Sequence, residues 1–181
     1  MSKVLGIDVG LSETGWAVVY SDFRLISYGV IKTKKWENKK TKLVNSDRDR
    51  IDYIASEIQV IINDEKPDYI AIEDFVYFGN KGKTTTTMPM LVENVRFLCR
   101  INGIIPKIYT NGHWKKTIMD NHKASKIQAQ FFIHHHYKLD AAHWNTFDKG
   151  GHIRDAMAVA TCVFYQIPKK KKIVKNCKKL F

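Results

Sequence analysis

Apolar and polar residues follow two different periods along the first part of the chain. Three short runs rich in β-branched and aromatic residues predict strands in antiparallel succession, with a turn at Ser21–Phe23. These runs are Val4–Asp8, Trp16–Tyr20 and Arg24–Ile31. The lysine-rich stretch Lys32–Asn45 predicts a polar connection. From Asp47 the apolar residues recur at i, i+3, i+4 and i+7, which predicts a helix that Pro67 closes.

The second part of the chain alternates between strand-like and helix-like patterns. Tyr69–Glu73 is a continuous apolar run, typical of a buried parallel strand, and Lys107–Thr110 suits a shorter strand. Gly79–Lys83 and the four threonines after it predict a loop, so that the next helix begins only after Pro89. Further helical patterns cover Ala124–Tyr137 and Ile153–Gln166.

These elements together predict an α/β fold with one mixed five-stranded sheet, first three antiparallel strands and then parallel ones, flanked by helices. We expect residues 1–168 to form one domain and residues 169–181 a basic C-terminal tail. Acidic residues stand at the ends of two predicted strands and near the start of the last helix. Ligands of open α/β sheets gather at such edges.

The net charge of +12 and the pI near 9.6 add a direction to this picture. Six lysines lie in Ile31–Lys42 and seven in Lys169–Phe181. Such clusters favour a polyanion partner, above all nucleic acid, although a nuclear-localisation tail or a membrane-surface patch has the same composition. No apolar run is long enough to span a membrane, and the three cysteines form no evident pair. We therefore expect no membrane segment and a reducing, intracellular compartment.

Three carboxylates are the candidate chemistry. Asp8, Glu73 and Asp155 come from distant segments, and the predicted topology brings them to one rim of the sheet. Carboxylates that bind hard divalent cations can clamp a phosphodiester and activate water, and Mg²⁺ prefers such ligands. Three ordinary surface or capping carboxylates remain an alternative on spacing alone. Asp74 and Asp148 are interpreted as spare acids.

Four segments, in order, resemble the RuvC-type Holliday junction resolvases. KVLGIDVGLSETGWAVVYSDFRLISYGVIK at Lys3–Lys32 has their G-I-D-x-G-x-x-x-T-G-aromatic opening, and YIAIE at 69–73 is similar to their second acidic strand. The pair Lys115 and Lys126 matches a lysine segment of the family, and HIRDAMAVA at 152–160 matches its closing acidic helix. The length and the lysine-rich end look most like the poxvirus branch, which would place the protein in the host cytoplasm.

This resemblance implies an RNase H-like fold and a homodimer that makes paired, symmetric nicks in branched DNA, namely four-way junctions. It also implies no small-molecule cofactor. Asp8, Glu73 and Asp155 take the metal-ligand places for Mg²⁺, with Mn²⁺ also supporting activity. His152 falls where many members carry a fourth acid, and positions i and i+3 let it address the same cation as Asp155. A histidine at the start of a helix is the alternative interpretation.

Lysines and aromatic residues are the candidates for DNA contact. The resemblance places Lys115 and Lys126 near the scissile phosphate, where a lysine neutralises developing charge. Aromatic side chains after Glu73 could stack on unpaired bases or belong to the core. The predicted DNA contacts are Phe75, Tyr77, Phe78, Lys81, Lys83 and Lys116.

The helix after Pro89 has an apolar sector wider than one sheet contact needs, which predicts a self-complementary dimer contact. Its candidates are Leu91, Val95 and Leu98, or their neighbours Met90 and Phe97. His134–His136 does not predict a zinc site, because consecutive helical residues diverge by about 100°. Two other functions remain open: a non-catalytic, basic DNA-architectural protein, and an RNase H-type nuclease that cuts RNA–DNA hybrids.

Overall fold

The computed structural model describes residues 1–33, 37–38, 43–44, 46–74 and 84–166. Its centre is a five-stranded sheet in the order β3-β2-β1-β6-β7. The strands are β1 (Lys3–Asp8), β2 (Glu13–Tyr20), β3 (Leu25–Lys32), β6 (Tyr69–Glu73) and β7 (Lys107–Tyr109). The first three pair antiparallel, and β6 is parallel to both β1 and β7. The predicted mixed sheet is therefore confirmed.

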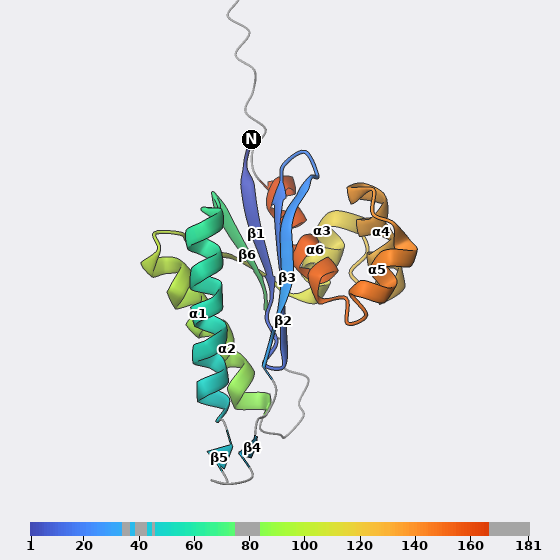
Figure 1. The fold of residues 1–181 in the computed structure, drawn as a ribbon. Helices are drawn as coiled ribbons and strands as arrows, with labels where there is room; N and C mark the ends of the chain where they lie inside the picture. The colour runs from blue at the N-terminus through green and yellow to red at the C-terminus, as the bar shows by residue number, and fades with distance from the viewer. Residues whose placement is uncertain (34–36, 39–42, 45, 75–83, 167–181) are drawn as a thin grey trace, which may run out of the picture.

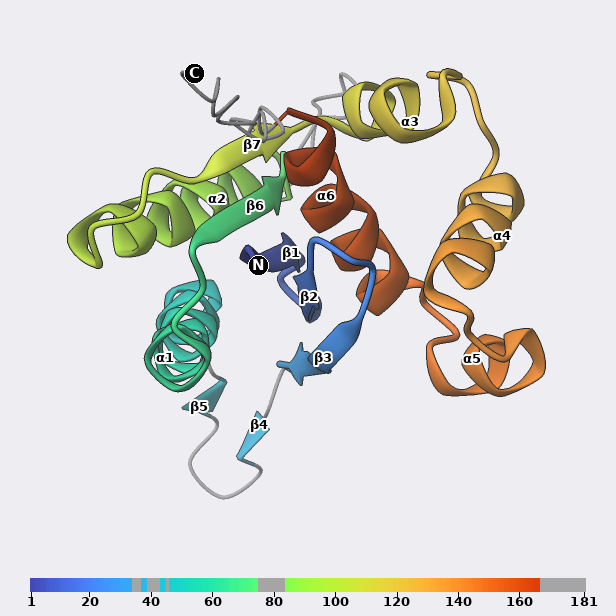
Figure 2. The same cartoon turned by 90° about the horizontal axis from the view of Figure 1, so that it is seen from above.

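Helices cover both faces of the sheet (Figures 1 and 2). On one face lie α1 (Asp47–Glu65) and α2 (Thr84–Ile101), and on the other lies α6 (His152–Gln166). Beyond α6 are α3 (Asn111–Met119), α4 (Lys126–Tyr137) and α5 (Ala141–Phe147). Successive side chains of β1 point to opposite faces of the sheet. Val4 packs in the core under α6, whereas Leu5 and Ile7 pack in the core under α1 and α2.

The last helix approaches the central strands closely because glycines and alanines line the contact. A Cβ on Gly6 would lie 1.9 Å from the carbonyl oxygen of Ala156, and a Cβ on Gly15 would lie 2.3 Å from that of His152. No larger residue fits at these two strand positions without moving the helix. The start of α6 is thereby held against the end of β1 and the start of β2.

The prediction for α2 was wrong in two respects. The helix begins at Thr84 rather than after Pro89, since Thr87 and Met88 are buried and that burial outweighs the weak helix propensity of threonine. Leu91, Val95 and Leu98 are buried in the core beneath the sheet, so they are unavailable for a contact between subunits. The exposed apolar residues of α2 are Met90 and Phe97, which the prediction named as alternatives, and Ile101.

Several short elements were not predicted. The described parts of the lysine-rich stretch contain a small antiparallel pair, β4 (Glu37–Asn38) and β5 (Leu43–Val44). The helices α3 and α5 are too short to show a helical period, and side chains define their starts: Thr110 caps α3 and Asp140 caps α5. None of the helices in the described part of the chain has the length and apolar character that a membrane span requires. The predicted tail at 169–181 lies outside the described residues.

Candidate active site

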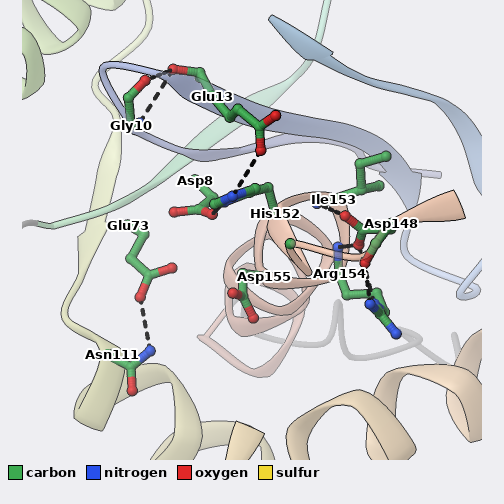
Figure 3. A network of polar contacts seen from close by, with 12 residues as sticks. Asp8, Gly10, Glu13, Glu73, Asn111, Asp148, His152, Ile153, Arg154 and Asp155 are labelled. Carbon is green, nitrogen blue, oxygen red and sulfur yellow. Dashed lines mark hydrogen bonds and ion pairs between the residues drawn. The ribbon is translucent and has the colours of Figure 1, made fainter. Parts of the chain in front are cut away.

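Three acidic side chains converge where β1 and β6 end and α6 begins (Figure 3). Asp8 is the last residue of β1, Glu73 is the last residue of β6, and Asp155 lies in the first turn of α6. Each offers a carboxylate oxygen, and these oxygens all lie within 4.8 Å of one another. Within the described ranges this is the one group of at least three histidine, cysteine, aspartate or glutamate residues with such spacing. The convergence expected from the sequence is therefore present.

Burial and mutual repulsion disfavour negative charge at this site. Burial, with a further contribution from Asp8, raises the pKa of Glu73 to about 7, even though Asn111 and Trp114 donate hydrogen bonds to its Oε1 at 3.0 and 3.2 Å. Burial followed by the charges of Asp8 and Glu73 raises the pKa of Asp155 to about 7. A divalent cation would offset this repulsion, and an all-oxygen donor set suits Mg²⁺ or Mn²⁺. The residues present thus fit a hard metal ion.

His152 stands beside the carboxylates but outside that group of three. It opens α6, and its Nδ1 lies 2.8 Å from Oδ2 of Asp8. This hydrogen bond is the main reason why the pKa of His152 is raised above its ordinary value. The helix places His152 and Asp155 on one side as the spacing predicted, with the imidazole directed at Asp8 (Figure 3).

The two lysines of the predicted pair have different neighbours. Lys126 begins α4, its Nζ is 4.0 Å from Oδ2 of Asp155, and it donates a hydrogen bond to the carbonyl of Gly150. Lys115 lies on α3 with its Nζ 5.5 Å from the ring centre of Trp114. Its positive charge offsets a small part of the rise in the pKa of Glu73, so it also acts on the site electrostatically.

Of the six predicted DNA contacts, only Lys116 lies among the described residues. Lys116 forms an exposed ion pair with Asp120. The other five predicted contacts, Phe75, Tyr77, Phe78, Lys81 and Lys83, lie outside the described residues.

Comparisons with known proteins give the family. A model of the family described as crossover junction endodeoxyribonuclease RuvC matches residues 4–163. The chain belongs to this family. The RuvC of Ehrlichia ruminantium (strain Gardel) is 32% identical over 172 residues, which are 91% of this chain and 98% of the relative. The RuvC of Caldicellulosiruptor saccharolyticus is 29% identical over 164 residues, 88% of this chain and 90% of the relative.

Solved structures of low sequence identity share the fold. The Thermus thermophilus RuvC in complex with Holliday junction substrate matches with a TM-score of 0.75 at 19% identity, over 92% of this chain and 95% of that one. The yeast mitochondrial Holliday junction resolvase Ydc2 matches with a TM-score of 0.59 at 14% identity, over 91% and 78%. The resemblance of the sequence to RuvC-type resolvases is thus confirmed at the level of the family and the fold.

In this RuvC-family chain a buried ion pair fixes the start of α6, and the sequence did not reveal it. Arg154 and Asp148 are both nearly inaccessible, with Nε of Arg154 3.1 Å from Oδ2 of Asp148. The same carboxylate accepts hydrogen bonds from the backbone N–H groups of Ile153 and Arg154. Asp148, interpreted above as a spare acid, is therefore a structural residue. Its distance of six positions from Arg154 does not place the two residues on one face of a helix.

Other members of the site were also missed. Asn111 and Trp114 hold Glu73 from the start of α3, and Glu13 reaches His152 from the start of β2. Of the three adjacent histidines, His134 is buried and contacts Arg154, with 3.2 Å between its Nε2 and Nη1. It therefore has a place in the buried polar cluster beside α6. No metal group among the described residues includes it.

Proposed function

We propose that this protein is a structure-selective DNA endonuclease that resolves four-way junctions by metal-dependent hydrolysis, making paired and symmetric nicks. The observation that carries the proposal is the cluster of Asp8, Glu73 and Asp155, whose carboxylate oxygens lie within 4.8 Å on a RuvC-family fold. The net charge of +12 suits a polyanionic substrate. A structural relative binds a Holliday junction, as its description states.

The roles of the residues follow from their positions. Asp8, Glu73 and Asp155 would hold Mg²⁺ or Mn²⁺, with His152 as the fourth ligand. The bound ions would supply activated water and stabilise charge on the scissile phosphate. Lys126, whose Nζ is 4.0 Å from Asp155, and Lys115, whose charge acts on Glu73, would neutralise the nearby phosphate oxygens.

Further contacts with the junction are assigned to lysines and aromatic residues elsewhere in the chain. We assign them to Lys116 and to the residues predicted from the sequence, Phe75, Tyr77, Phe78, Lys81 and Lys83, together with the tail at 169–181. The two RuvC sequence relatives described above come from bacteria. The poxvirus branch, with its host-cytoplasmic location, is inferred only from chain length and the lysine-rich end.

Four end-labelled substrates test the proposed function and separate it from the two alternatives. A four-way junction, a linear duplex, a single strand and an RNA–DNA hybrid are each incubated with Mg²⁺, Mn²⁺ or EDTA. We expect symmetric nicks on the junction with either metal and none with EDTA. Cleavage confined to the hybrid would identify an RNase H-type enzyme. Tight binding of the junction without any cleavage would identify an architectural protein.

Metal binding should weaken as the pH falls below about 7. The pKa of Glu73 and that of Asp155 are each raised to about 7, mainly by burial, so these carboxyl groups hold protons at pH 6 that a cation must displace. The affinity for Mg²⁺ should therefore rise between pH 6 and 8 and level off above that range. Calorimetry at pH 6 in two buffers of different ionisation enthalpy measures the released protons. Binding at pH 6 without proton release would contradict this account.

We also propose a homodimer formed through the exposed apolar face of α2, since two nicks within one binding event need two sites. Met90, Phe97 and Ile101 are 52, 64 and 61% exposed. Phe97→Glu should weaken dimerisation at least about 30-fold, as expected for loss of a central aromatic contact. Sedimentation velocity measures the change, and Tyr53→Glu on α1, also an exposed aromatic, is the matched control. A wild-type protein that stays monomeric both free and on a junction would contradict the proposal.

A further inference from the structure

The imidazole of His152 has a carboxylate on each side. Its Nδ1 is 2.8 Å from Oδ2 of Asp8, and its Nε2 is 3.4 Å from Oε2 of Glu13. Figure 3 shows the ring between these two acids, with Glu13 on the side away from Glu73 and Asp155. The nitrogen that faces the carboxylate cluster is therefore Nδ1, and the outer nitrogen faces Glu13.

Two glycines restrict the position of this side chain. A Cβ on Gly150 would lie 2.5 Å from Cδ2 and 2.7 Å from Nε2 of His152, and a Cβ on Gly15 would lie 2.7 Å from the Cβ of His152. The ring is thus in close contact with the backbone near its outer edge and at its base. Such packing limits sideways movement, and Glu13 supplies the polar partner for Nε2.

Glu13 is itself held in place. It pairs in register with Lys32 across β2 and β3, and Nζ of Lys32 lies 3.4 Å from its Oε1. One oxygen therefore faces Lys32 and the other faces His152. Glu13 and His152 both line an open cavity of about 710 Å³. The site is therefore accessible from the side of these two residues.

We propose that Glu13 is a positioning residue, whose carboxylate accepts the Nε2 proton of His152 and keeps Nδ1 directed at Asp8 and the cation site. The inference rests on the proposed function, in which His152 is a ligand of the metal ion. Histidine ligands generally donate their second ring N–H to such a partner, and loss of the partner lowers metal affinity about 10- to 100-fold. Loss of Glu13 should therefore lower metal affinity only when His152 is present.

A double-mutant cycle on metal affinity tests this dependence. Mn²⁺ is the probe because it accepts nitrogen ligands readily, and calorimetry on the DNA-free protein gives the affinity without any cleavage. Glu13→Ala should weaken Mn²⁺ binding at least about tenfold. Glu13→Gln should restore most of the affinity, since its amide oxygen accepts the same proton although the charge is lost. In the His152→Ala background, Glu13→Ala should change the affinity less than about twofold.

Asp52→Ala is the matched control, because it removes one negative charge from an exposed position on α1. It should leave Mn²⁺ affinity unchanged, and thermal melting checks that every variant is folded. An equal loss of affinity on Glu13→Ala with and without His152 would overturn the proposal, since Glu13 would then act by its charge alone. Unchanged binding by folded Glu13→Ala would also overturn it. A wild-type protein that binds Mn²⁺ but cuts no junction would instead contradict the proposed function and leave the cycle interpretable.

Discussion

Asp155→Asn should abolish cleavage and at the same time make the metal-free protein more stable. A bound cation stabilises transition-state charge by several kcal/mol, so loss of a ligand should slow cleavage on the order of 10³-fold or more. Asp8→Asn and Glu73→Gln should slow cleavage to the same extent. Junction binding should persist in all three variants, because affinity for DNA comes mainly from the basic surface. Gel-shift and cleavage assays on the same preparations measure both properties.

The gain in stability follows from the raised pKa of Asp155, about 7 against an ordinary value of 3.8. Between those two values the folded protein binds a proton that the unfolded chain has lost, so stability of the metal-free protein falls as the pH rises through about 7. At pH 8 the folded state carries a buried negative charge that Asp8 and Glu73 also repel, and asparagine removes that charge. We expect a gain of about 2 kcal/mol, or roughly 4–8 °C in Tm.

The exposed Asp52→Asn is the control for both measurements in this variant, and it should change neither cleavage nor stability. Differential scanning calorimetry in EDTA gives the melting temperatures. If Asp155→Asn melts below the wild type at pH 8, the three carboxylates do not repel one another as their spacing indicates. If it cleaves junctions at a near-normal rate, Asp155 does not belong to the catalytic site.

Arg154→Ala should destabilise the protein by about 3–5 kcal/mol, the usual cost of removing one partner from a buried ion pair. The guanidinium has three further partners besides the Asp148 carboxylate: the carbonyl of Asp148, Asn145 and His134. Removal of the guanidinium would leave the buried carboxylate of Asp148 without its positive partner at the start of α6. Because His152 and Asp155 lie on that first turn, cleavage should fall together with Tm.

An exposed pair provides the comparison for Arg154. Arg24 contacts Asp22 with 2.7 Å between Nε and Oδ2, but the two side chains are 58 and 34% exposed. Arg24→Ala should therefore lower the melting temperature far less than Arg154→Ala. Thermal denaturation of both variants under one condition gives the difference. Equal melting temperatures would show that burial adds nothing to the Arg154–Asp148 pair.

The sequence by itself determined the sheet and most of the carboxylate site. Strands and long helices follow from local periods of two and 3.6 residues, which any short window of sequence displays. Asp8 and Glu73 directly end apolar runs, so their place at a strand end could be predicted without knowing the fold. The spacing of His152 and Asp155 likewise placed both on one turn of a helix.

The tertiary structure alone decided which partners these residues meet. His152 lies 144 positions from Asp8 along the chain, and Glu13 is the first residue of β2, ahead of the strand predicted at Trp16–Tyr20. On α2, Leu91 and Val95 are buried but Phe97 is exposed. Which apolar residues of this helix enter the core depends on the neighbouring α1 and the sheet. Contacts of this kind depend on three-dimensional packing between segments far apart, and no local period of the sequence carries that information.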